Sequence, residues 1–249
     1  MNSFFKTISN LLFPPRCAAC REILPYYSDA LLCDECAEKW KEEISSKCAV
    51  CRRLVSECSC VHDNCKRTVS ALLSVSAYTS SDSVTDLLVL AAKDHKDKKL
   101  FKFMSDKMTE IAYGALPGVG DLLVTFVPRS ASRKRETGHD QSEILAGLVA
   151  DNFSAEMIPL FKKKGRRQQK SLRAHDREIN ARRSYVLIKD ATHTVKGRAV
   201  LLCDDVVTTG ASVSACAEML RETGAERVYV LTFAKTVKKI KTDRKNSKE

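Results

Sequence analysis

The residues of this chain with the clearest chemistry are two adjacent aspartates, Asp204 and Asp205, followed by a short polar turn at residues 208–210. The apolar run at residues 198–203 predicts a strand that leads into the acids, and residues 212–223 are expected to form a helix after the turn. Where a strand of an open α/β sheet meets a helix, such a turn presents backbone N–H groups and hydroxyls to a ligand. The helix dipole adds partial positive charge, so the turn suits a phosphate.

The two acids suit a different part of the same ligand. Carboxylates accept hydrogen bonds from the hydroxyl groups of a ribose, whereas a carboxylate placed directly against a phosphate repels it. Gly210 has no Cβ and lets the backbone approach the ligand closely. A nucleotide P-loop is excluded because the turn lacks the Gly-Lys-Ser/Thr ending. The predicted sugar-phosphate loop consists of Asp204, Asp205, Val206, Val207, Thr208, Thr209, Gly210, Ala211 and Ser212.

Nine of the eleven cysteines lie between positions 17 and 65, which indicates a metal-binding module. The first four form two Cys-x2-Cys pairs, Cys17 with Cys20 and Cys33 with Cys36. Each such turn points both sulfurs inward and aims backbone N–H groups at them, so two turns complete a tetrahedral Zn²⁺ shell. A disulfide framework is the alternative. It suits a secreted chain, and the first residues of this sequence do not read as a secretory signal.

A second zinc site is expected just after the first. Its preferred ligands are Cys48, Cys51, Cys58 and Cys60. Pairing of Cys60 with Cys65, or His62 as a ligand, is the alternative. A segment this short buries little core, so metal binding must supply much of its folding free energy, and one or two structural zinc ions are expected. Cys203 and Cys216 stand apart and are expected to be small buried side chains.

The chain has 249 residues and a formal net charge of +11, with the excess concentrated in two places. Residues 161–183 hold ten Lys and Arg against two acidic residues, and residues 235–249 hold seven against two. Such clusters suit a polyanionic partner, and a solvated face with a frayed tail is the alternative. No apolar run reaches the roughly 20 residues of a membrane-spanning helix.

From residue 67 on, expected strands alternate with expected helices, which predicts an α/β domain with a parallel sheet. The expected strands are residues 71–78, 121–127, 185–188, 198–203 and 227–233, and the expected helices are residues 82–92, 98–113, 141–153 and 212–223. The predicted organisation is an amphipathic helix at 1–16, a double zinc ribbon at 17–66, the α/β domain at 67–235 and a disordered basic tail at 236–249.

Residues 200–212 resemble the signature with which type I phosphoribosyltransferases bind 5-phosphoribosyl 1-diphosphate (PRPP). Residues 17–235 as a whole resemble the ComF family, also called the competence-protein or amidophosphoribosyltransferase-like family. Glu136, Thr137 and His139 depart from the pattern of that family. The shared motifs are the cysteine pairs up to Cys51, Val127-Pro128-Arg129, Gln141 and Ser142, and Gln169, Leu172, Arg177 and Asn180.

The resemblance implies a phosphoribosyltransferase-type parallel sheet flanked by helices and preceded by the zinc module. It also implies PRPP with Mg²⁺ as ligand, and Arg129 as a clamp on the pyrophosphate. Single-stranded DNA and competence helicase-type proteins are implied as partners in DNA uptake, and we expect a cytoplasmic location. Phosphoribosyl transfer, DNA handling and a PRPP-responsive regulator without turnover all fit. No acceptor site is recognisable, and no glutamine-hydrolysing domain is visible, which argues against amidophosphoribosyl transfer.

Overall fold

The computed structural model describes most of the chain apart from its two ends and several connections. The described residues are 13–48, 51, 53–58, 60, 65, 68–79, 82–94, 96–116, 121–164, 181–189 and 191–236. Most of the expected amphipathic helix at 1–16 and of the expected tail at 236–249 therefore lies outside the described residues. The same is true of residues 165–180, the middle of the first basic cluster.

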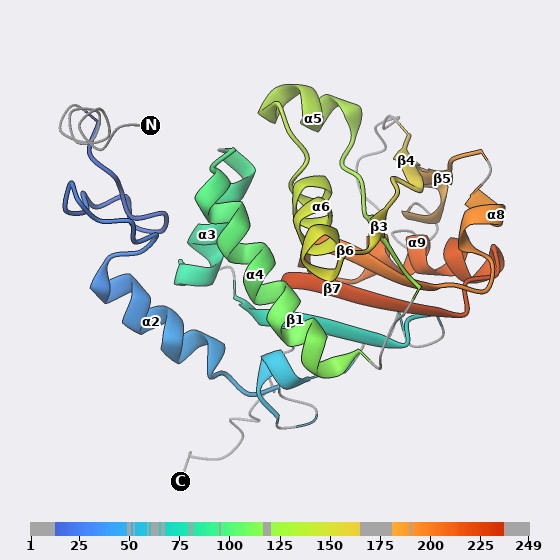
Figure 1. Ribbon diagram of the computed structural model, residues 1–249, viewed down its shortest axis with the longest axis horizontal. Helices are drawn as coiled ribbons and strands as arrows, with labels where there is room; N and C mark the ends of the chain where they lie inside the picture. The colour runs from blue at the N-terminus through green and yellow to red at the C-terminus, as the bar shows by residue number, and fades with distance from the viewer. Residues whose placement is uncertain are drawn as a thin grey trace, which may run out of the picture.

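A five-stranded parallel sheet forms the centre of the protein (Figure 1). Across the sheet the strands are β1 (Ala71–Tyr78), β7 (Arg227–Thr236), β6 (Ala199–Val207), β2 (Leu122–Phe126) and β3 (Glu156–Met157). Every neighbouring pair is parallel. All five residues of β2 are buried, as expected for a parallel strand covered on both faces. Because the strands are parallel, the carboxyl ends of β2, β6 and β7 meet at one edge of the sheet.

Helices cover both faces of this sheet. One face packs against α3 (Val84–Asp94), α4 (Lys98–Ala115) and α6 (Gln141–Phe153), and the other against α8 (Ala191–Val195) and α9 (Ala211–Glu222). Residues 199–203 of β6 alternate between these two cores, as the pleat of a strand requires. No helix in the described part of the chain is long and apolar enough to cross a membrane. The predicted α/β class is confirmed.

Two of the expected strands differ from the structure in an informative way. β6 continues to Val207, so Asp204 and Asp205 lie within the strand and not in a loop after it. β5 (Tyr185–Leu187) does not join the parallel sheet, because it pairs antiparallel with β4 (Phe161–Lys163) in a separate two-stranded sheet. The short helix α5 (Ala131–Thr137) was not predicted. Cys203 and Cys216 are both fully buried, as predicted.

A carboxylate joins the cysteine-rich segment to the helix layer. Glu43, in α2 (Asp34–Ile44), accepts hydrogen bonds from the backbone N–H groups of Val84 at 2.7 Å and Thr85 at 2.9 Å, and from the Thr85 hydroxyl at 2.8 Å. The first N–H groups of a helix have no partner within it, so Glu43 caps α3. Trp40 of α2 lies against Phe103 of α4, with ring centroids 4.9 Å apart.

The substitution Glu43→Ala should lower the free energy of unfolding by about 1–3 kcal/mol, because three donors lose their acceptor at the start of α3. The neighbouring variant Glu42→Ala, at an exposed side chain, should change it by less than about 0.5 kcal/mol. Urea unfolding of the zinc-replete protein, followed by circular dichroism, measures both. Equal effects would contradict a specific role of Glu43 at the contact between α2 and α3.

Candidate functional site

The candidate ligand site lies at the carboxyl edge of β6, the middle strand of the sheet. After Val207 the chain turns through Thr208 and Thr209, which are exposed, and enters α9 at Gly210. Gly210 is the N-cap of that helix and has a φ of 77°, a left-handed conformation that glycine adopts without strain. Its carbonyl oxygen accepts the N–H of Ser214 at 2.7 Å. The positive end of the α9 dipole therefore lies beside the turn.

Asp204 is the acid that the fold holds most firmly. Its Oδ1 accepts the Ser142 hydroxyl at 2.8 Å and the Asp205 backbone N–H at 3.0 Å. Burial raises the pKa of Asp204 well above its usual range, and the Asp205 carboxylate raises it further, while the Ser142 hydrogen bond lowers it. A carboxylate in this position is stabilised in its charged form by a nearby cation or by further hydroxyl donors.

Asp205 faces two cations that come from different elements. Its Oδ2 lies 3.8 Å from Lys93 Nζ, near the end of α3, and 3.7 Å from an Arg129 guanidinium nitrogen, in the loop after β2. This oxygen is buried and has no hydrogen-bond partner among the described residues. Both ion-pair distances exceed that of a hydrogen bond, so the two cations can contact an anionic ligand without leaving the site. Sequence reasoning missed Lys93, whose only local feature is a basic residue near a helix end.

The segment around His139 positions both cations. The backbone N–H of Arg129 donates to Asp140 Oδ2 at 2.8 Å. Burial raises the pKa of Asp140, and this N–H partly offsets the effect. The imidazole of His139 lies between two carbonyl oxygens, that of Ala92 at 2.9 Å from Nε2 and that of Thr137 at 2.8 Å from Nδ1. His139, a departure from the ComF pattern, thus connects the end of α3 to the loop that carries Arg129.

The other residues of the predicted loop contribute in different ways. Val207 is buried in one core, and the partly buried side chain of Val206 packs against the other. Ala211 and Ser212 form the first turn of α9. Burial raises the pKa of Tyr185, while a hydrogen bond with Ser212 lowers it, so this tyrosine of β5 reaches the start of α9. Lys163 of β4 donates to the Tyr185 hydroxyl at 2.9 Å. Sequence reasoning placed Lys163 in the first basic cluster and gave Tyr185 no role in the site.

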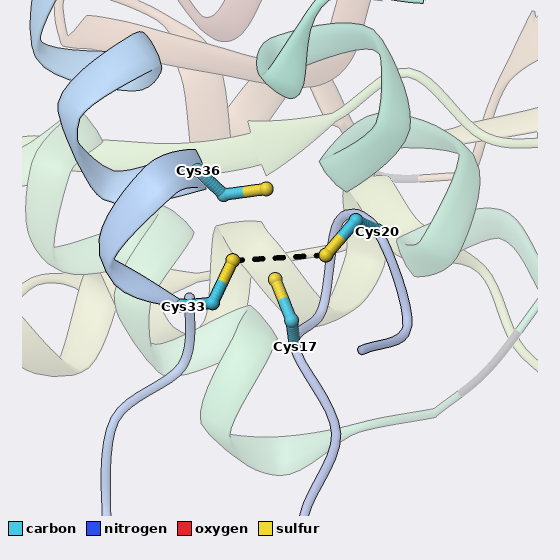
Figure 2. Close-up of side chains that lie close together, drawn as sticks. All are labelled: Cys17, Cys20, Cys33 and Cys36. Atoms are coloured by element: carbon cyan, nitrogen blue, oxygen red, sulfur yellow. Dashed lines mark hydrogen bonds between the residues drawn. The ribbon is translucent and has the colours of Figure 1, made fainter. Parts of the chain in front are cut away.

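The first set of cysteines brings four sulfurs together (Figure 2). The sulfurs of Cys17, Cys20, Cys33 and Cys36 lie within 4.8 Å of one another, and all four thiols are free. In a tetrahedral site with Zn–S bonds of about 2.3 Å, neighbouring sulfurs are about 3.8 Å apart, and the Cys20 and Cys33 sulfurs are separated by 3.7 Å. Burial acts to raise the pKa of Cys17, but backbone N–H groups outweigh it and lower the value to about 7. The set fits a zinc ion.

The second set consists of the four cysteines that the sequence analysis preferred as ligands. The sulfurs of Cys48, Cys51, Cys58 and Cys60 also lie within 4.8 Å of one another, so this set fits a zinc ion as well. The backbone N–H of Cys60 points at the Cys58 sulfur from 3.4 Å. The alternative ligand Cys65 lies elsewhere, since its sulfur is 3.6 Å from the Gly210 carbonyl oxygen. His62, the other alternative, is outside the described residues.

Solved structures that are similar to this chain include an enzyme of purine biosynthesis and two phosphoribosyltransferases. An allosteric regulatory enzyme of purine biosynthesis is 18% identical, with a TM-score of 0.39, over 58% of this chain and 30% of its own. A hypoxanthine phosphoribosyltransferase from Staphylococcus aureus is 11% identical over 60% of this chain and 74% of its own, with a TM-score of 0.38. An adenine phosphoribosyltransferase is 18% identical over 56% of this chain and 72% of its own, with a TM-score of 0.37.

The comparison of sequences finds one similarity, in the carboxy-terminal part of the chain. No curated protein matches the chain. Residues 139–249 match the family model called Phosphoribosyl transferase domain. The matched residues include β6, the turn at 208–210 and α9, which are the elements that build the candidate site. With its parallel sheet flanked by helices, the domain that contains these residues has the phosphoribosyltransferase fold.

Proposed function

We propose that this protein binds PRPP, together with Mg²⁺, at the carboxyl edge of β6. The observation that carries the proposal is the pair Asp204 and Asp205 at the end of the middle strand, directly before the turn at 208–210 and α9. Backbone N–H groups of the turn and the dipole of α9 bind the 5-phosphate. The two carboxylates accept hydrogen bonds from the ribose hydroxyls.

The pyrophosphate of the ligand is assigned to Lys93 and Arg129. In phosphoribosyl transfer, the bond from the anomeric carbon to the pyrophosphate oxygen breaks while the acceptor forms a new bond to that carbon. Negative charge then grows on the leaving pyrophosphate. Lys93 and Arg129, which lie 3.7–3.8 Å from Asp205, can stabilise this charge. The Oδ2 of Asp205, which accepts no hydrogen bond from the described residues, is an oxygen suited to Mg²⁺. When bound, the ion would supply further charge neutralisation.

We further propose that the two sets of four cysteines hold structural zinc and that the protein is a member of the ComF family. The support is the combination of two cysteine sets with a phosphoribosyltransferase domain, together with Ser142, a shared motif residue that contacts Asp204. Single-stranded DNA as a partner follows from the resemblance and from the basic clusters, and helicase-type partners follow from the resemblance alone. Within the described residues no contact points to them, and most of the first basic cluster lies outside those residues.

Elemental analysis of protein purified without chelators should return about two zinc ions per chain, because closed thiolate sites retain their metal. A Cys20→Ser variant should lose about one of them, and Cys216→Ala, at a buried cysteine outside both sets, should lose none. Less than one zinc in the wild-type protein would refute the zinc module. A value near one zinc ion per chain would refute only the second zinc site.

Turnover can be tested by ³¹P NMR of the protein with PRPP and Mg²⁺. If the protein is a transferase, free pyrophosphate should appear when pooled bases, amines or single-stranded DNA are added, and its amount should equal that of the new phosphoribosyl product. If PRPP binds but stays intact with every acceptor, the result would favour the alternative raised by the sequence, a PRPP-responsive regulator without turnover. The double variant Asp204→Ala and Asp205→Ala serves as the control for spontaneous hydrolysis of PRPP.

The double substitution Asp204→Ala and Asp205→Ala should weaken Mg²⁺–PRPP binding by roughly two to four orders of magnitude. Each charge-assisted hydrogen bond from a ribose hydroxyl contributes about 1.5–3 kcal/mol to the binding free energy. A difference of about 1.4 kcal/mol corresponds to a tenfold change in affinity. Removal of two charges beside a polyphosphate also relieves repulsion, but bound Mg²⁺ already neutralises much of that charge. Calorimetry measures the affinity of both proteins.

The matched control is Asp151→Ala, at an exposed acid of α6, which should leave the affinity within about threefold of wild type. Because both site acids lie in β6, thermal unfolding should be recorded for each variant. If the double variant is folded and still binds PRPP within about threefold of wild type, the two acids do not bind the ribose.

A further inference from the structure

Lys235 is a buried cation outside the proposed PRPP site. In the sequence it is the first residue of the basic cluster at 235–249, but it lies in β7 and is only 4% exposed. Its ammonium group donates to the Cys58 carbonyl oxygen at 3.2 Å and lies 3.4 Å from the Cys58 sulfur. Cys58 is itself fully buried and belongs to the second cysteine set. A lysine from the far end of the chain therefore contacts a proposed zinc ligand directly.

The charge of the cysteine set explains why a buried lysine is stable there. An ammonium group away from water is costly unless it is paired with negative charge. Four thiolates around one Zn²⁺ carry a net charge of about −2, and in the second set Cys48 and Cys58 are buried. Lys235 offsets part of that charge through Cys58. In the first set the nearby basic residue Lys39 is instead exposed and pairs with Glu35 at 2.6 Å.

The same lysine is adjacent to the phosphate-binding turn. In the parallel ladder between β6 and β7, Lys235 aligns with Val207, the residue just before Thr208. The cysteine-rich segment makes a second contact at the other end of the turn, where the Cys65 sulfur lies 3.6 Å from the Gly210 carbonyl oxygen. The Cys65 carbonyl in turn accepts the Val69 N–H at 2.9 Å, just before β1. Both ends of the turn at 208–210 are thus supported from this segment.

We propose that Lys235 is the counter-ion of the second cysteine set and couples it to the phosphate-binding turn. With zinc in the set, Cys58 holds the ammonium group and the end of β7 in place, and β7 holds the strand that leads into the turn. PRPP affinity then depends on the second set more than on the first. Lys235 is a positioning residue in this scheme. The inference rests on the zinc and PRPP sites proposed above.

The first test measures release of zinc to a chromogenic chelator. In Lys235→Met the second zinc should be released about 10- to 100-fold faster, the usual effect of losing a partner of a metal ligand, and Lys235→Arg should restore most of the retention. The first zinc in the same protein is an internal reference and should keep its rate, as should both ions in Lys102→Met, at an exposed lysine of α4. Unchanged release, or equal acceleration of both ions, would overturn the counter-ion role.

The second test compares PRPP binding in two cysteine variants by calorimetry. Cys60→Ser, in the second set, should weaken binding about tenfold more than Cys33→Ser, in the first set, and Lys235→Met should resemble Cys60→Ser. Equal effects of the two cysteine variants would overturn the coupling. A wild-type protein with no zinc or no PRPP affinity would refute the proposed function instead, so the two failures are distinguishable.

Discussion

The convergence of strand ends at one edge of the parallel sheet is the constraint on which the site depends. Only a parallel arrangement brings the end of β6, with its two acids, next to the end of β2, with Arg129. The charged form of Asp204 is costly there because burial and the neighbouring Asp205 carboxylate disfavour it, and the Ser142 hydroxyl from α6 offsets part of that cost. Lys93 from α3 and Arg129 from the β2 loop face the carboxylate of Asp205. A ligand rich in hydroxyls and phosphates can use the same groups.

The cysteine-rich segment is joined to the domain through charged groups as well as through apolar packing. The Glu43 carboxylate caps α3, whose far end carries Lys93. The Lys235 ammonium reaches Cys58 from β7. Both contacts lead, through one helix or one strand, to residues of the candidate site. The cysteine-rich segment is therefore connected to the candidate site by direct contacts, which a tethered module would not make.

Much of the local architecture was predictable because its physical causes are local. The bounds of β1 and α6 follow from apolar periodicity, and the turn at 208–210 follows from residue types that favour a strand-to-helix turn. The composition of each cysteine set follows from the short loops between its pairs, which leave the sulfurs few other partners. The errors also have a local cause. The apolar run stops at Cys203, so the strand was expected to end there and the two acids were expected in a loop.

The sequence by itself determined the α/β class, the turn at 208–210 and the two sets of four cysteines. The strands and helices, the turn and the cysteine pairs are each set by residues within about twenty positions of one another. Only the tertiary structure decided which cations face the acids, that β5 leaves the main sheet and that Lys235 is buried against Cys58. Lys93 and Asp205 are far apart in the chain, as are Cys58 and Lys235. Their meeting depends on the strand order β1-β7-β6-β2-β3, which is set by packing of the whole sheet and not by any local pattern of residues.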